Sequence, residues 1–178
     1  MSGIVICGGN GSGKTTLGRE LSGVLNYKHM DIEDYYFPDA PIPYSKSRTR
    51  EEVCELMLKD IKKYKNFIIS AVNGDMSEEI NSKYDLAVFL DVPLDIRLKR
   101  VKQRAYNKFG GRVLEGGDMY EQEQRFFNAV ANAYEEKTER VKEWLKTLSC
   151  PVIYIDGTMD IAENVKSIIN LIRNIGFN

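Results

Sequence analysis

Residues 8–15 read Gly8-Gly-Asn-Gly-Ser-Gly-Lys-Thr15, and they match the pattern G-x-x-x-x-G-K-[ST] at every fixed position. The apolar run GIVIC at residues 3–7 precedes this stretch and predicts a strand, and a helical pattern follows from near Thr15. A glycine-rich turn between a strand and a helix lets backbone N–H groups converge on phosphate, and the positive end of the helix dipole adds to their field. The sequence therefore predicts a phosphate-binding loop.

The two polar residues that end the motif indicate a triphosphate with a bound metal. Lys14 is expected to reach the β- and γ-phosphates, and the Thr15 hydroxyl is expected to ligate Mg²⁺. We therefore expect ATP and Mg²⁺ as cofactors. The loop residues expected to bind ATP are Gly8, Asn10, Gly11, Ser12, Gly13, Lys14, Thr15 and Thr16.

Short apolar runs rich in β-branched residues recur along the rest of the chain. They are FIISAV at 67–72, LAVFLD at 86–91 and PVIYID at 151–156, with a weaker run at 27–31. Near-continuous hydrophobicity is typical of strands covered on both faces, as in parallel sheets. Patterns with helical spacing separate the runs, so the sequence predicts βαβ units and a three-layer α/β fold. We expect residues 1–178 to form a single domain.

Composition narrows the classes of partner. The chain has 178 residues, with 25 basic and 26 acidic side chains and a net charge of −1, so a surface for nucleic acid is not expected. No segment approaches the roughly 18 consecutive apolar residues of a membrane span, and no export signal is apparent. The three cysteines lack disulfide or zinc spacing, and a cytoplasmic location is expected. Composition does not indicate the oligomeric state.

Two segments are predicted to be long loops: residues 34–49, with three prolines, and residues 106–118, with four glycines. A row of arginines leads into the second loop. Arg97, Arg100 and Arg104 each precede an apolar residue of the helix that follows residue 91, and Arg112 lies in the loop itself. Arginines on a closing loop can stabilise a phosphoryl group while excluding water, although such a row can equally be aliphatic stems at the edge of an apolar face.

The absence of other motifs favours transfer over hydrolysis. The Asn107-Lys108 pair is not followed by x-Asp, so the guanine motif NKxD is missing. Asp91, which ends a strand, is followed by Val92-Pro93 and not by the glutamate that orients water in many ATPases. The sequence therefore favours an enzyme that passes the phosphoryl group to an acceptor and shields it from water.

The whole chain resembles the nucleoside monophosphate kinase and shikimate kinase group of P-loop kinases. The matching stretches are GGNGSGKTT, HMDIEDYY, RTREEV, FIISAVNGD, VFLDVPLDIRLKRVKQR and DGT, in the expected order. The resemblance implies a parallel five-stranded sheet of order 2-3-1-4-5, an acceptor-binding region at about 35–65 and a lid at about 105–118. It also implies that Arg100 and Arg104 lie near ATP and that Gly157-Thr158 lies beside the adenine ring.

An acidic cluster follows the second predicted strand: Asp31, Glu33 and Asp34. Asp31 and Glu33 occupy the positions of the D-x-D of shikimate kinases, where the first carboxylate lies near the metal and the second near the acceptor hydroxyl. The string from Asp34 to Pro38 resembles instead the D-[DS]-F-[YF]-x-P of uridine and nicotinamide riboside kinases, where the aspartate is the base. Either alignment favours a hydroxyl acceptor, because an alcohol must lose its proton during transfer. The simpler alternative is that some of these three carboxylates only cap a helix or form local ion pairs with Arg48 or Arg50.

Further acceptor contacts are expected from residues outside the acidic cluster. Arg48 and Arg50 open the helix that starts in RTREEV, where a bidentate arginine could hold a carboxylate or phosphate. For these two arginines the alternative is a surface helix start with local ion pairs. Asn73 and Gly74 follow a strand at its carboxyl end, where open α/β sheets bind ligands, although a plain turn would look the same. The predicted catalytic residues are Lys14, Glu33, Asp34, Arg104 and Arg112, and the predicted metal contacts are Thr15 and Asp31.

The combined hypothesis is an ATP-dependent phosphotransferase acting on a nucleoside, a nucleotide or a hydroxylated metabolite. The alternative from another class is an ATP-binding regulatory protein or an ATPase that keeps the loop without acceptor chemistry. A nucleic-acid end kinase would need a basic groove, which the near-neutral charge disfavours.

Overall fold

The predicted strands all form one parallel sheet in the computed structural model, which describes residues 2–38, 47–132 and 134–174. The order β2-β3-β1-β4-β5 confirms the expected topology. In register, Ile4 of β1 lies between Ile68 of β3 and Leu86 of β4. The strands are β1 (Ser2–Cys7), β2 (Lys28–Asp31), β3 (Asn66–Ala71), β4 (Leu86–Asp91) and β5 (Val152–Asp156).

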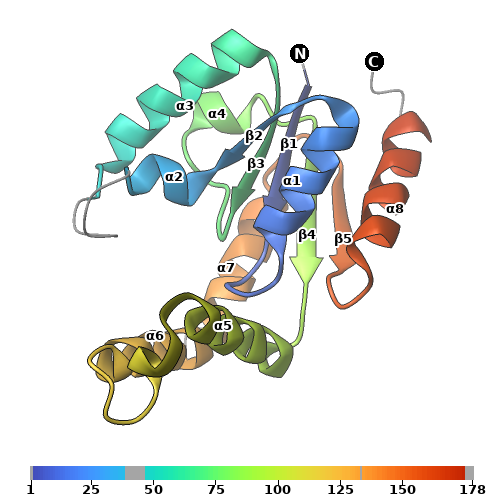
Figure 1. Cartoon of the computed structure of the whole chain (residues 1–178). Helices are drawn as coiled ribbons and strands as arrows, with labels where there is room; N and C mark the ends of the chain where they lie inside the picture. Colours follow the sequence, from blue (N-terminus) through green and yellow to red (C-terminus); the bar gives the residue numbers. More distant parts are fainter. Residues whose placement is uncertain (1, 39–46, 133, 175–178) are drawn as a thin grey trace.

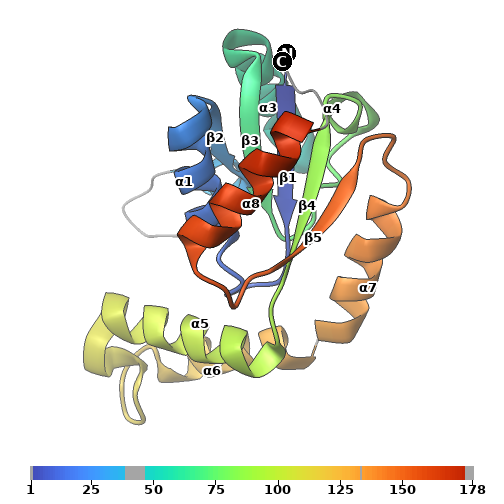
Figure 2. The ribbon, with the colours of Figure 1, turned by 90° about the vertical axis from the view of Figure 1, so that its right-hand side faces the viewer.

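Helices cover both faces of this sheet, which explains why its central strands are mostly apolar and buried. Helices α1 (Lys14–Leu25) and α8 (Ile161–Asn174) pack on one face (Figures 1 and 2). Helices α3 (Arg50–Tyr64), α4 (Glu78–Asn81) and α7 (Tyr134–Leu145) contribute to the core on the other face. Successive side chains of a strand point to opposite faces, so Ile4 and Ile6 enter the first core while Val5 and Cys7 enter the second.

The contact between α1 and the sheet depends on a glycine. A Cβ on Gly18 would lie 2.4 Å from the Ser70 hydroxyl oxygen and 2.7 Å from Nε2 of His29. His29 Nε2 and Ser70 Oγ are themselves hydrogen-bonded at 2.9 Å, and Ser70 Oγ donates to the Lys14 carbonyl oxygen at 3.2 Å. The lone histidine thus packs where α1 meets β2 and β3, and it helps to hold the start of α1 on the sheet.

The first of the two segments predicted as loops is partly helical. Residues 32–36 form the short helix α2 (Ile32–Tyr36), while residues 39–46 of the predicted loop lie outside the described part of the chain. Helix α3 begins after Thr49 with a capping box, in which Glu52 Oε2 accepts from the Thr49 N–H at 2.8 Å and Thr49 Oγ1 accepts from the Glu52 N–H at 3.3 Å. The expectation of an irregular segment from residue 34 was therefore wrong for its first turn.

The second segment is also more ordered than predicted. Helix α5 (Leu94–Phe109) runs four residues into the expected loop, and the 3-10 helix η1 (Gly110–Val113) follows it. The chain then enters α6 (Tyr120–Asn132), and Val113 is buried against Val101 and Phe127 in a small separate core. Because α5 and α6 lie across the carboxyl ends of the strands (Figures 1 and 2), this substructure is placed over the phosphate-binding loop.

None of the helices in the described residues is long and apolar enough to cross a membrane.

Candidate active site

A cavity of about 220 Å³ at the carboxyl ends of β1 and β3 brings together the phosphate-binding loop, part of the acidic cluster and two arginines of α5. We call it the phosphate cavity. The sequence-predicted site residues that line it are Asn10, Gly11, Gly13, Lys14, Thr15, Thr16, Asp31, Glu33, Arg100 and Arg104. Ser70, Ala71 and Val72 form the part of the wall that comes from β3 and the residue after it, and Ile32 and Val101 complete the lining.

The Lys14 side chain packs against the backbone of the phosphate-binding loop. Its side chain is buried, and Nζ donates to the Gly9 carbonyl oxygen at 2.9 Å. Burial lowers the pKa of Lys14 from 10.5 to about 8, although the negative charges of Glu33 and Asp31 oppose this shift. A desolvated ammonium is suited to a phosphate anion, which can replace the Gly9 carbonyl as its partner.

Thr15 and Asp31 form the second polar element of the phosphate cavity. The Thr15 hydroxyl donates to Oδ2 of Asp31 at 2.8 Å, and Oδ1 of Asp31 accepts from the Glu33 N–H at 3.1 Å. Asp31 is thereby the N-cap of α2, the helix that carries Glu33 and Asp34. One carboxylate oxygen faces the loop while the other orients the acidic cluster.

The pair of Thr15 and Asp31 fits a magnesium ion of the P-loop type. Mg²⁺ prefers oxygen ligands and is usually held by one or two protein groups together with phosphate oxygens and water. In the described part of the chain no group of three or more histidine, cysteine or acidic side chains could hold a metal. The ion would therefore take most of its ligands from the nucleotide and from water.

Arg100 connects the phosphate-binding loop to the end of β5. Its guanidinium donates to the Ser12 carbonyl oxygen at 3.2 Å and twice to the Gly157 carbonyl oxygen at 3.1 Å. Gly157 is held in turn by its N–H, which donates to the Asp91 carbonyl oxygen at 2.7 Å. The Thr158 hydroxyl and N–H both donate to Asp156. Arg100 thus joins two segments expected to contact ATP.

Arg97 is a structural part of the loop that sequence reasoning did not assign to the site. It is 3% exposed, with Nε donating to the Val92 carbonyl oxygen at 3.1 Å and Nη1 to the Asn10 carbonyl oxygen at 3.2 Å. A Cβ on Gly9 would meet this guanidinium at 1.8 Å, so Gly9 is the residue that lets the loop lie against it. The signal in the sequence that could have identified Arg97 was its position in the first turn of the helix that follows the strand ending at Asp91.

We expect Arg97→Met to weaken ATP binding about tenfold and to lower the free energy of unfolding by about 2–3 kcal/mol. The physical reason is that the Val92 and Asn10 carbonyls would lose charged donors inside the protein. ATP titration and urea unfolding measure the two effects. Lys99→Met, on an exposed position of the same helix, is the control. Equal ATP affinity in both variants would show that Arg97 does not shape the loop.

The remaining predicted arginines lie elsewhere. Arg112 pairs with Asp118 at 2.7 Å across the turn between η1 and α6, and more than half of each side chain is exposed. Arg48 Nη1 donates to the Tyr35 carbonyl oxygen at 2.7 Å, and Arg50 donates to the Asp75 and Met76 carbonyl oxygens at 2.9 Å. These arginines are outside the set of residues that line the phosphate cavity. Arg48 and Arg50 bind backbone carbonyls, and thereby fasten the start of α3 to α2 and to the segment after β3.

Gly74 and Asp34 are also outside the phosphate cavity. The Gly74 carbonyl oxygen accepts from the Tyr84 hydroxyl at 2.9 Å, and a Cβ there would lie 2.5 Å from Val5 Cγ2. Gly74 is therefore a packing position. Asp34 lines a smaller hollow of about 160 Å³ together with Lys28, His29 and Asp31, and Asp31 also lines the phosphate cavity.

A second, larger cavity of about 470 Å³ lies on the other side of the loop and is lined by α6 and α7. We call it the helical cavity. It shares Asn10 and Val72 with the phosphate cavity, so the two adjoin at the loop. Asn73, predicted as a substrate contact, lines this one, and its Oδ1 accepts from the Asp75 N–H at 3.0 Å. Its lining residues are Gly8, Gly9, Asn10, Val72, Asn73, Phe89, Arg97, Phe126, Ala129, Val130, Lys137, Thr138, Arg140 and Val141.

Comparison with known proteins agrees with this geometry. The family model described as "AAA domain" matches residues 4–128. Uncharacterized protein YqaC of Bacillus subtilis (strain 168) is 34% identical over 176 residues, which cover 96% of this chain and 97% of that one. A shikimate kinase of Clostridium botulinum (strain Langeland) is 34% identical over 118 residues, or 60% of this chain and 69% of that one. The structure of shikimate kinase from Bacteroides thetaiotaomicron has the same fold, with a TM-score of 0.60 at 19% identity, covering 97% and 98% of the two chains.

Proposed function

The chain belongs to the AAA domain family and to the nucleoside monophosphate kinase and shikimate kinase group of P-loop proteins, and we propose that this ATP-dependent small-molecule kinase phosphorylates a hydroxyl group. The acceptor would be a nucleoside, a nucleotide or a hydroxylated metabolite. The observation that carries the proposal is that Glu33 and Lys14 line the same cavity. A carboxylate beside the transferred phosphoryl group is useful to an alcohol, which must lose a proton, and of less use to a phosphate acceptor, which is already an anion.

Binding of the triphosphate falls to the loop and α5. Backbone N–H groups at the start of α1 and the Lys14 ammonium would hold the phosphates, together with Arg100 and Arg104, which line the same cavity. Thr15 and Asp31 would hold Mg²⁺, which when bound neutralises charge on the β- and γ-phosphates. Arg104 is exposed and directly precedes the expected lid at about 105–118, so it can move with the lid when the site closes.

Glu33 would act as the general base. Its carboxylate takes the proton of the acceptor hydroxyl while the acceptor oxygen forms a bond to the γ-phosphorus. The bond between that phosphorus and the β,γ-bridging oxygen breaks, and ADP leaves with the electron pair. Lys14 stabilises the charge that spreads over the transferred group. Asp34 lines the adjoining hollow with His29 and is not among the residues that line the phosphate cavity, which favours Glu33 over Asp34 for this role.

We expect purified protein to consume ATP slowly alone and much faster with the correct acceptor. The test is a screen of nucleosides, nucleoside monophosphates and hydroxy acids such as shikimate, read by ADP formation. Phosphorus NMR of the product distinguishes a phosphate ester, which the proposal requires, from a phosphoanhydride. ATP binding without stimulation by any of these acceptors would favour a regulatory ATP-binding protein, and fast turnover without acceptor would favour an ATPase.

A further inference from the structure

Helix α2 carries the proposed base, and it is too short to be stable alone. It has five residues, none of them fully buried, whereas isolated helices shorter than roughly 12 residues are marginal in water. Glu33 is the second residue of α2, and no residue that the structure describes donates a hydrogen bond to its carboxylate. The placement of Glu33 in the phosphate cavity therefore depends on the contacts that hold α2.

Contacts at both ends of α2 fix where the helix lies. At its start, the Asp31 carboxylate accepts from the Glu33 N–H at 3.1 Å. At its end, Arg48 donates through Nη1 to the Tyr35 carbonyl oxygen at 2.7 Å and through its N–H to the Tyr36 carbonyl oxygen at 2.8 Å. Because all three contacts are to backbone groups near the helix axis, they hold its ends but give little leverage on its rotation about that axis.

A side-chain hydrogen bond to α3 supplies this leverage. The Tyr35 hydroxyl donates to Oδ2 of Asp60 at 2.6 Å, and both residues are half-buried. With about 3.6 residues per helical turn, side chains two positions apart point to nearly opposite sides of a helix. Tyr35 therefore anchors one side of α2 to α3, while Glu33 on the other side lines the phosphate cavity.

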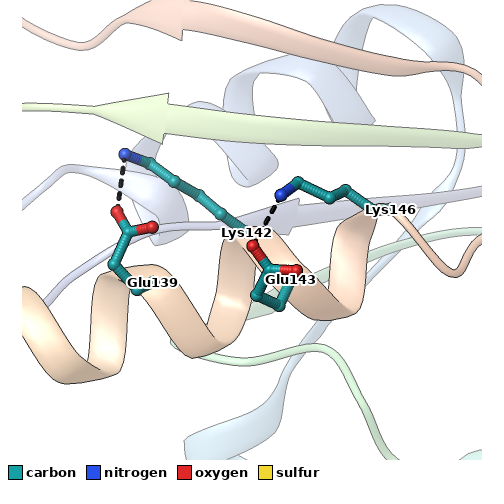
Figure 3. Close-up of polar contacts among 4 residues, drawn as sticks. All are labelled: Glu139, Lys142, Glu143 and Lys146. Carbon is teal, nitrogen blue, oxygen red and sulfur yellow. Dashed lines mark hydrogen bonds and ion pairs between the residues drawn. The ribbon is translucent and has the colours of Figure 1, made fainter.

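This hydrogen bond differs from the local ion pairs of α7. Figure 3 shows Lys142 paired with Glu139 and Lys146 paired with Glu143, each three residues apart on one helix. Exposed pairs of this kind contribute little to stability. The bond between α2 and α3 joins two helices through residues 25 positions apart, at a distance usual for a hydroxyl bound to a carboxylate.

The donor of this hydrogen bond is present throughout the working pH range. Burial raises the pKa of Tyr35 well above its usual value, and the hydrogen bond to Asp60 raises it further. The hydroxyl therefore keeps its proton under any conditions in which the protein would be assayed.

We propose that Tyr35 and Asp60 are positioning residues of the kinase, which through their hydrogen bond hold the Glu33 carboxylate in line with the acceptor hydroxyl. This inference rests on the proposed function, in which Glu33 is the base. Neither residue is among those that line the phosphate cavity, so both act through α2 and not by contact with the transferred group.

The first test removes the tyrosine hydroxyl alone. The control for Tyr35→Phe is Tyr27→Phe, because Tyr27 is also half-buried and its hydroxyl has no hydrogen-bond partner among the described residues. The probe acceptors are shikimate, adenosine and adenosine 5′-monophosphate. We expect Tyr35→Phe to lower kcat about tenfold and to change the KM for ATP less than about threefold, because it disturbs the alignment of a reacting group and not the nucleotide site. Asp60→Asn keeps an oxygen that can accept the bond, so it should retain most of the rate that Asp60→Ala loses.

A double-mutant cycle separates positioning from general destabilisation. Glu33→Gln has no base left to position, so the addition of Tyr35→Phe should lower its kcat by less than about twofold. An equal loss with and without the Glu33 carboxylate would overturn the inference, and so would a Tyr35→Phe enzyme as active as Tyr27→Phe. If Glu33→Gln alone keeps the wild-type kcat, the proposed base is wrong and this inference is wrong with it.

Hydrogen exchange gives a second readout that needs no acceptor. The Phe37 N–H donates to the Glu33 carbonyl oxygen at 2.8 Å at the end of α2, so its exchange reports how firmly this helix is held. We expect faster exchange in Tyr35→Phe than in Tyr27→Phe. Equal exchange would overturn the link between α2 and α3 whether or not phosphorylation is seen. Faster exchange without phosphorylation of any probe would contradict the proposed function and leave that link in place.

Discussion

Lys14→Met should lower kcat by about 10²–10³-fold, the loss usual for removing one preorganised charged donor from a phosphoryl or acyl transfer site. The substitution keeps the length of the aliphatic stem and removes only the ammonium that lies in the fold of the loop. Turnover with the best acceptor of the screen, followed by ADP formation, measures the effect. Acceptor-dependent turnover that persists in Lys14→Met would show that the loop does not bind the transferred phosphate in the way proposed.

The stability of Lys14→Met provides its control. In the free protein the Lys14 ammonium is desolvated, and its pKa of about 8 shows that the fold disfavours the charged form. Removing this group should therefore leave the Tm unchanged or raise it, so that loss of activity cannot be ascribed to unfolding. Between the folded pKa of about 8 and the ordinary value of 10.5, the unfolded chain binds more protons than the native one, so Lys14 makes stability rise with pH in that window.

The same pKa predicts how ATP affinity depends on pH. Below about pH 8 Lys14 of the free protein is charged, and above it the proton is lost progressively. ATP needs the ammonium, so its dissociation constant should rise as pH increases beyond about 8, and binding at pH 9 should be accompanied by proton uptake. Calorimetry in buffers of different ionisation enthalpy measures that uptake. In Lys14→Met, the dissociation constant for ATP should not show this pH dependence, and ATP binding should not be accompanied by proton uptake.

The sequence predicted the loop and the sheet because local patterns decide both. The loop from Gly8 to Thr15 is formed by its own backbone together with the strand before it and the helix after it. The apolar runs form neighbouring strands of one sheet, as their burial on both faces implies. Arg100 was expected near ATP from the resemblance, and that contact stays a prediction, but the structure does place its side chain against the loop. It binds the Ser12 and Gly157 carbonyls, two segments 145 residues apart in sequence that only the folded sheet brings together.

The acceptor side could not be predicted in the same way. Arg48 and Arg50 lie in the expected region, but the partners that occupy them are carbonyls of Tyr35, Asp75 and Met76, which no side-chain pattern encodes. Lys137, which lines the helical cavity, was not singled out in the sequence for the opposite reason. The alternating glutamates and lysines of α7 resemble a solvated helix face, and the signal that sets Lys137 apart is its four-residue spacing to the buried Val141.

Glu33→Gln should reduce kcat by about 10²–10⁴-fold while changing the KM for ATP little, because general-base catalysis contributes about that much and the carboxylate does not bind the nucleotide. Glutamine keeps the shape and a hydrogen-bond acceptor, but it cannot take the proton of the acceptor hydroxyl. The rate of the variant should therefore recover in part with an acceptor whose hydroxyl is more acidic. Steady-state kinetics at saturating acceptor measure kcat and the KM for ATP separately.

Asp34→Asn is the matched control for Glu33→Gln, because both carboxylates lie on α2 within one residue of each other but only Glu33 lines the phosphate cavity. The Asp34 variant should keep kcat within about threefold, a change of less than 1 kcal/mol in the barrier. The reverse result, a large loss with Asp34→Asn and a small one with Glu33→Gln, would assign the base to Asp34. Small losses with both would remove the case for a hydroxyl acceptor, since a phosphate acceptor is already an anion and needs cations but no base.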